Sequence, residues 1–159
     1  MRFFEDSLIL DLAAKAAASP RRRAHFNIHG SPSDPIQRFF VVAEADTYFR
    51  PHRHRINAEL ATVLKGRFDL LTFDEGGHVL SRHGVGEGSG QFAYEAPMGT
   101  WHTLVPVGGP VAFLEVKQGP YDPATAADFA AWAPPEGDDS VPRFQRWLRE
   151  AQVGGLYSG

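Results

Sequence analysis

Residues 51–66 read PHRHRINAELATVLKG, a stretch in which residue types that bind metals lead directly into an apolar run. His52 and His54 are separated by one residue, and Glu59 opens the run that Gly66 ends. Alternate side chains of an extended backbone point to the same side, so both imidazoles can converge on one point. The stretch therefore predicts a β-strand preceded by a pair of candidate ligands.

A second stretch, PMGTWH at residues 97–102, supplies a third histidine. Its Pro and Gly are typical of a tight turn, and His102 follows where a new strand is expected. Three imidazoles and one carboxylate suit a divalent transition metal and leave positions open for water or a ligand. The alternative is a set of hydrogen-bonded polar residues in a barrel without metal. We predict a metal site made of His52, His54, Glu59 and His102.

The composition is that of an ordinary globular domain. The 159 residues carry a formal net charge of −3, include 43% hydrophobic residues and contain no cysteine. The lack of cysteine excludes disulfides, a thiolate metal site, a cysteine nucleophile and an iron–sulfur cluster. Any metal must therefore bind to His, Asp or Glu side chains.

Charge and hydropathy narrow the class of partner. A nucleic-acid-binding domain normally has a strongly basic face, whereas the basic cluster here is the short run Arg21 to Arg23. No window approaches the ~20 apolar residues of a membrane span, and the N-terminus lacks the basic-then-apolar order of a signal peptide. We expect a cytoplasmic protein whose partner is a small molecule rather than nucleic acid or a membrane.

Short runs of Val, Phe, Leu, Tyr and Thr are separated by Gly, Asp and Pro over residues 36–118. This spacing predicts a mainly β protein, either a sandwich or a barrel. A hairpin turn is expected at residues 74–77. The predicted strands are Gln37–Glu44, Glu59–Leu64, Phe68–Phe73, His78–Arg82, Gln91–Ala96, Trp101–Val105 and Val111–Lys117.

Helices are expected on both sides of these strands. Asp6 is a candidate N-cap for a helix over residues 7–19, and Ala124–Trp132 is compatible with a second helix. Ser140 and Pro142 open a third helix, whose apolar stripe predicts that the tail docks on the barrel or on a neighbouring subunit. We divide this single domain into an N-terminal segment (1–35), a barrel (36–119) and a helical tail (120–159).

The spacing His52-x-His54-x4-Glu59-x6-Gly66, followed by Pro97-x-Gly99-x2-His102, resembles the paired motifs of the cupin superfamily. The resemblance implies a double-stranded β-helix, or jelly-roll, barrel in which these histidines and the glutamate bind one metal. Two positions depart from the pattern, because Asp46 stands where the first motif usually has Gly and Pro106 where the second often has Asn. Neither is a ligand position.

Further segments are similar to the WbuC-type cupin fold metalloproteins. They are RRRAHFNIH at residues 21–29, Gln37-Arg38, YFRPHRH at residues 48–54 and EVKQGPY at residues 115–121. Members of that group occur among bacterial genes for O-antigen and surface-polysaccharide biosynthesis, and their reaction is unassigned. The resemblance implies a fold and a bound metal, but it does not identify a substrate. Because many members of the family form dimers, it also implies a homodimer.

An anionic ligand could be held by the basic N-terminal segment. His25, Asn27 and His29 share one face if this segment is extended. An Arg side chain can hold a carboxylate or phosphate in a bidentate fork. A solvated turn is the alternative, since most short charge runs are exposed. The candidate substrate contacts here are Arg23, His25, Asn27 and Arg38.

Lys117 and Trp101 complete the candidate substrate contacts. For Trp101 and Tyr94 a core position is favoured over a role in stacking on a ligand, because aromatic side chains usually fill small barrels. Lys117 and Glu115 lie two positions apart and form either an inward, functional pair or an exposed ion pair. The sequence does not distinguish an inward pair from an exposed one.

The leading functional hypothesis is a metal-dependent cupin enzyme for a small carbohydrate-derived or carboxylate-bearing substrate. Glu115 or His29 would move a proton while the metal acts as a Lewis acid, giving isomerase or epimerase chemistry, or a dioxygenase with Fe(II). The alternatives are a non-catalytic binding protein, in which the metal is structural or orients the ligand, and a metal-free sugar epimerase. The ligand set does not distinguish Fe, Mn, Zn and Ni.

Overall fold

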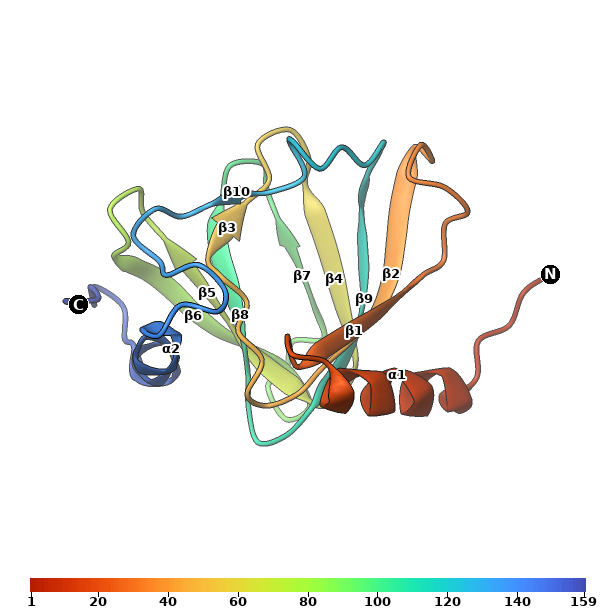
Figure 1. Cartoon of the computed structure of the whole chain (residues 1–159), viewed down its shortest axis with the longest axis horizontal. Coiled ribbons are helices and arrows are strands. Elements are labelled where there is room, and N and C mark those ends of the chain that lie inside the picture. The colour runs from red at the N-terminus through yellow and green to blue at the C-terminus, as the bar shows by residue number, and fades with distance from the viewer.

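Two five-stranded antiparallel sheets face each other and form a jelly-roll barrel, as predicted (Figure 1). This computed structural model describes residues 1–159. In spatial order, the first sheet contains β1 (Arg23–Asn27), β2 (Ile36–Ala43), β9 (Val111–Gln118), β4 (Glu59–Lys65) and β7 (Ala93–Ala96). The second contains β10 (Asp128–Phe129), β3 (His52–Arg53), β8 (Trp101–Pro106), β5 (Arg67–Phe73) and β6 (Val79–Gly86).

All seven predicted strands are present, with small shifts at their ends. Three further strands, β1, β3 and β10, were not predicted as strands. β3 and β10 are two residues long, which is too short for an alternating pattern to be visible. The segment expected only to be extended, around His25, pairs with β2 as the edge strand β1.

Apolar side chains from both sheets fill the closed part of the barrel. Phe68 of β5 and Phe113 of β9 are fully buried, and their rings meet edge to face at 5.7 Å between centroids. Ala61 and Leu104 belong to the same cluster. This packing joins the two sheets, as in other sheet-on-sheet cores.

The first helix, α1 (Asp6–Ala18), covers the outer face of the first sheet (Figure 1). It packs Leu12 and Ala16 against Val42 and Ala112. The predicted N-cap is wrong, because Asp6 is already the first helical residue and no side chain caps the helix. The Asp6 carboxylate lies in the first turn, where the helix dipole still favours a negative charge.

The C-terminal tail docks on the second sheet of the barrel. Docking on the barrel was one of the two predicted arrangements. Helix α2 (Val141–Glu150) begins after Ser140 and has Pro142 in its first turn, as expected. Phe144 and Leu148 are buried in a cluster that includes Phe73 of β5. No helix in the structure is long and apolar enough to cross a membrane.

The predicted helix Ala124–Trp132 is wrong. Part of this segment is β10, in which Phe129 pairs with His52 of β3. The backbone N–H of Ala130 also donates to the carbonyl of Pro51 at 2.9 Å. Pairing with a strand far away in the sequence overrides the local helix propensity of the alanines here.

Candidate metal centre

The four predicted ligands come together inside the barrel, between the two sheets. His52 of β3 lies directly opposite His102 of β8 in the second sheet. His54 follows β3, and Glu59 is the first residue of β4 in the first sheet. One ligand atom from each residue lies within 4.8 Å of the others.

Each histidine of this cluster is oriented by a backbone carbonyl. The carbonyl accepts a hydrogen bond from Nδ1, so Nε2 is the ring nitrogen that faces the common centre. The acceptors are Arg50 for His52 (3.0 Å), Ala126 for His54 (2.6 Å) and Thr100 for His102 (2.8 Å). The three Nε2 atoms are thereby arranged as metal ligands.

Glu59 is buried and ionised. Its Oε2 lies 2.8 Å from His54 Nε2, and its Oε1 accepts a 2.8 Å hydrogen bond from the Tyr94 hydroxyl. Burial acts to raise the pKa of Glu59, but the neighbouring polar and charged groups of His102, His54 and Lys117 outweigh burial and hold this pKa well below its ordinary range. The centre therefore offers a carboxylate, the form that binds a cation.

These residues fit a divalent transition metal. His102 Nε2 is buried without a hydrogen-bond partner and lies 3.7 Å from Glu59 Oε1, beyond hydrogen-bonding distance. A buried polar atom without a partner costs free energy, and metal coordination would remove that cost. Burial also lowers the pKa of His52 to about 3, so its ring is neutral and able to bind a metal at neutral pH.

A cavity of about 480 Å³ adjoins this centre. Lys117 belongs to its wall and also places Nζ 3.7 Å from Glu59 Oε2, so the cavity and the centre meet at this side chain. Other polar groups of its wall are Arg21, Arg23, His25, Asn27, His29, Gln37, Glu115 and Tyr121. The cavity wall thus contains most of the predicted substrate contacts, namely Arg23, His25, Asn27 and Lys117.

Two predicted substrate contacts lie outside the cavity. Arg38 is exposed and is not part of the wall, because side chains alternate along β2 and its neighbours Gln37 and Phe39 take the inward positions. Trp101 is buried in the apolar cluster under α2, where its Nε1–H donates to Glu75 at 3.1 Å. The structure therefore places Arg38 on the surface and Trp101 in the core.

Glu115 and Lys117 form an inward pair. Lys117 Nζ donates to Glu115 Oε1 at 2.7 Å, and both side chains are more than four-fifths buried. Burial and the charge of Glu59 raise the pKa of Glu115, although Lys117 partly opposes this shift. Glu115 therefore holds a proton more readily than an exposed glutamate does.

His29 is buried at the edge of the cavity, just after β1. Its Nδ1 lies 3.0 Å from both the backbone nitrogen and the carbonyl oxygen of Arg38, which hold this side of the ring. Its ring meets Phe39 edge to face at 5.0 Å, and Lys117 Nζ lies 5.4 Å from the centroid of the same phenyl ring. His29 and Lys117 thus both lie close to the Phe39 ring.

Two residues of this region were not identified as site residues from the sequence. Tyr94 resembles a core aromatic, but its hydroxyl contacts a candidate ligand from β7. Glu136 lies in the C-terminal tail and contacts Arg21 and Arg23. The sequence separation of Glu136 from these arginines exceeds 110 residues, so no local pattern could reveal the contact.

Two facing antiparallel sheets around three histidines and one glutamate define a cupin-type barrel with a centre that fits a metal. The family described as "Domain of unknown function (DUF6016)" matches residues 4–85, more than half of the chain, and the protein belongs to this family. No curated protein sequence matches the chain.

Solved structures share the fold at low sequence identity. CapF with the inhibitor 3-isopropenyl-tropolone is 15% identical with a TM-score of 0.57, over 69% of this chain and 32% of CapF. Recombinant oxalate oxidase in complex with glycolate is 17% identical with a TM-score of 0.55, over 84% of this chain and 68% of the oxidase. KdgF from Halomonas sp. is 18% identical with a TM-score of 0.50, over 67% of this chain and 84% of KdgF. This chain spans about a third of the length of CapF. These similarities concern the fold alone.

Proposed function

We propose that this protein is a metal-dependent cupin enzyme that acts on a small, anionic substrate derived from a carbohydrate or a carboxylic acid. One observation carries the proposal: three oriented histidine Nε2 atoms and a buried carboxylate meet beside a polar cavity. A site that were only structural would not need a cavity of substrate size at its side. Isomerisation or epimerisation is the reaction class that we favour.

His52, His54, Glu59 and His102 would hold the metal. When bound, it would supply a Lewis acid that polarises a carbonyl or hydroxyl group of the substrate. The backbone carbonyls of Arg50, Ala126 and Thr100 keep the three imidazoles in place, so little reorganisation is needed on binding.

Glu115 would move the substrate proton. Its Oε1 is held by Lys117, whereas no protein group bonds Oε2. Its raised pKa brings the carboxyl closer to the working pH, as a group that alternately takes and gives a proton requires. His29, which is oriented by the Arg38 backbone and belongs to the same cavity wall, is a second candidate for moving a proton.

Surface-polysaccharide biosynthesis is the setting that we propose. The motifs similar to WbuC-type cupins support it, and one solved structure of this fold is described as a capsular polysaccharide assembling protein, CapF from Staphylococcus aureus. That protein is 15% identical and covers 66% of this chain, so the support concerns fold and motif rather than substrate.

The test is a ligand screen followed by turnover. Sugar nucleotides and sugar acids would be screened by thermal shift against metal-loaded and metal-stripped protein, and each stabilising compound would be incubated with the loaded protein. We expect stabilisation that requires metal, and conversion that is lost in Glu115→Gln while binding remains. Equal stabilisation without metal and no conversion would instead indicate a non-catalytic binding protein.

A further inference from the structure

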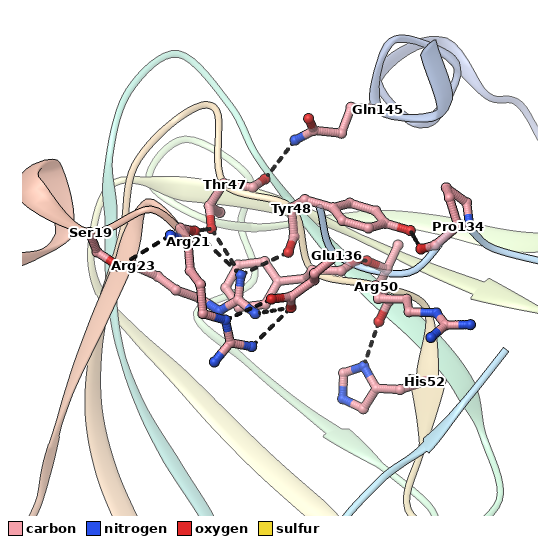
Figure 2. Close-up of polar contacts among 12 residues, drawn as sticks. Ser19, Arg21, Arg23, Thr47, Tyr48, Arg50, His52, Pro134, Glu136 and Gln145 are labelled. Carbon is pink, nitrogen blue, oxygen red and sulfur yellow. Dashed lines mark hydrogen bonds and ion pairs between the residues drawn. The ribbon is translucent and has the colours of Figure 1, made fainter. Parts of the chain in front are cut away.

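Glu136 sits between Arg21 and Arg23, two arginines of the cavity wall (Figure 2). Its carboxylate accepts two hydrogen bonds from Arg21, one from Nε at 2.7 Å and one from Nη2 at 2.9 Å. Arg23 Nη2 donates to the same carboxylate. One carboxylate thus takes the forked hydrogen bonds with which arginine recognises carboxylates and phosphates in general.

The arginine run is divided between the cavity and the surface. Arg21 and Arg23 line the cavity, whereas Arg22 does not. Arg22 has a φ of 56°, a left-handed conformation that is uncommon for a residue with a side chain, and its guanidinium pairs with Asp46 at 2.9 Å. The local backbone therefore brings two of three neighbouring charges to the same cavity.

Arg23 is held in place without help from Glu136. Its Nη1 donates to the carbonyl of Tyr48 at 2.8 Å and lies 3.3 Å from Thr47 Oγ1, and the guanidinium stacks over the Phe49 ring at 4.8 Å. Its side chain is 13% exposed. If Glu136 left, Arg23 Nη2 would remain in position with no partner.

Glu136 contacts the two arginines through its side chain, whereas the segment that contains it is held to the barrel by other residues. The Tyr48 hydroxyl donates to the Pro134 carbonyl at 2.9 Å, and α2 follows a few residues later (Figure 2). About a third of the Glu136 side chain is exposed. A change of its rotamer would release both arginines while the tail stayed docked.

We propose that Arg21 and Arg23 form the binding site for the oxyanion group of the ligand, a carboxylate or a phosphate, and that Glu136 occupies this site as an internal competitor until the ligand displaces it. The proposal rests on the proposed function in that it takes the cavity to be the ligand site. The charged residues of the cavity wall are Arg21, Arg23, Lys117 and Glu115, and this excess of positive charge favours an anion.

The test measures anion binding directly. Inorganic phosphate and acetate are titrated by calorimetry into the wild type, Glu136→Ala and the matched control Asp46→Ala, at constant ionic strength. Asp46 also pairs with an arginine and its loss changes the net charge equally, but Arg22 lies outside the cavity. Metal content is measured in the same samples, so loss of the metal centre is seen separately from loss of this site.

We expect Glu136→Ala to bind phosphate, acetate or both about tenfold more tightly than the wild type. This gain corresponds to a Glu136 side chain that occupies the site in about nine-tenths of the wild-type molecules. Asp46→Ala should bind like the wild type. Adding Arg21→Gln to Glu136→Ala should cancel the gain, and Arg21 is 61% exposed, so this change should not unfold the protein. The anion that gains more identifies the ligand group.

Two outcomes would overturn the proposal. Unchanged or weaker binding of both anions to Glu136→Ala would show that the contact only ties the tail to the barrel. An equal gain in Asp46→Ala would show a general effect of net charge. Either result would leave the metal centre and its proposed chemistry untouched.

Discussion

The Tyr94 hydroxyl holds the oxygen of Glu59 that faces His102. It donates to Glu59 Oε1 at 2.8 Å, and His102 Nε2 lies 3.7 Å from the same oxygen. Partners that orient a metal-binding side chain typically contribute 10–100-fold to affinity. We therefore predict that Tyr94→Phe lowers metal affinity at least about tenfold, measured by competition with a chelator of known affinity.

Tyr48→Phe is the matched control for this change. It also removes a tyrosine hydroxyl that donates to an oxygen, the Pro134 carbonyl at 2.9 Å, but this bond lies away from the centre. Metal affinity should be unchanged in Tyr48→Phe. Equal affinities in the two variants would show that Tyr94 is only a core aromatic.

The ion pair of Glu136 makes stability depend on pH. Burial acts to raise the pKa of Glu136, but hydrogen bonds from Arg21 and Arg23 outweigh it and lower the pKa below the ordinary value of 4.5. A lowered pKa in the folded state stabilises the fold above pH 4.5, and this contribution is lost as the pH falls through the folded-state value. The wild type should exceed Glu136→Gln by up to about 1 kcal/mol at pH 7.

Urea unfolding over a pH series measures this difference. It should shrink steadily once the pH falls below 4.5, because the protonated carboxyl no longer pairs with the arginines. A difference that stays constant down to the lowest pH at which both proteins fold would mean that Glu136 acts through its shape rather than its charge.

At the scale of elements, α2 is held on the second sheet by its apolar stripe. Phe144 is fully buried and packs edge to face on Tyr48 at 6.0 Å between ring centroids. Phe144→Ala would leave a cavity under the helix and should cost about 3–5 kcal/mol of unfolding free energy. Chemical denaturation checks this, with Leu10→Ala as the control, since Leu10 of α1 is exposed and its loss should cost under about 0.5 kcal/mol.

Strand β4, which carries Glu59, was predictable because its first residues alternate between a buried and an exposed face. In β4, Glu59 and Ala61 are buried while Leu60 is exposed, and this repeat of two also puts the glutamate inside. That His52, His54 and Glu59 share one site was predicted from their residue types and from the resemblance of their spacing to the cupin motif.

The elements that long-range contacts create could not be predicted. β10 forms because Phe129 pairs with His52, and the same tail supplies the Ala126 carbonyl that orients His54. Neither contact produces a recognisable pattern in the local sequence, because the alanines there favour a helix. Tyr94 and Glu136 were missed for the same reason, since each meets its partner across the fold.

At the scale of the whole molecule, we predict a homodimer. The outward side chains Leu60 and Leu64 of β4 are exposed, and Phe92 near the same sheet is 73% exposed. Apolar surface of this kind marks contact sites in many proteins. Light scattering should give twice the chain mass of 17.5 kDa. A mass of one chain at micromolar concentration would refute the dimer.

The most direct test of the central claim, that the barrel holds one metal, is elemental analysis of untagged protein purified anaerobically without added metal. We predict close to one Fe, Mn, Zn or Ni per chain, with loss of the metal and a lower melting temperature in His102→Ala. The control His78→Ala, which changes an exposed histidine paired with Asp74, should keep the metal. Substoichiometric metal in the wild type, or full occupancy in His102→Ala, would contradict the account.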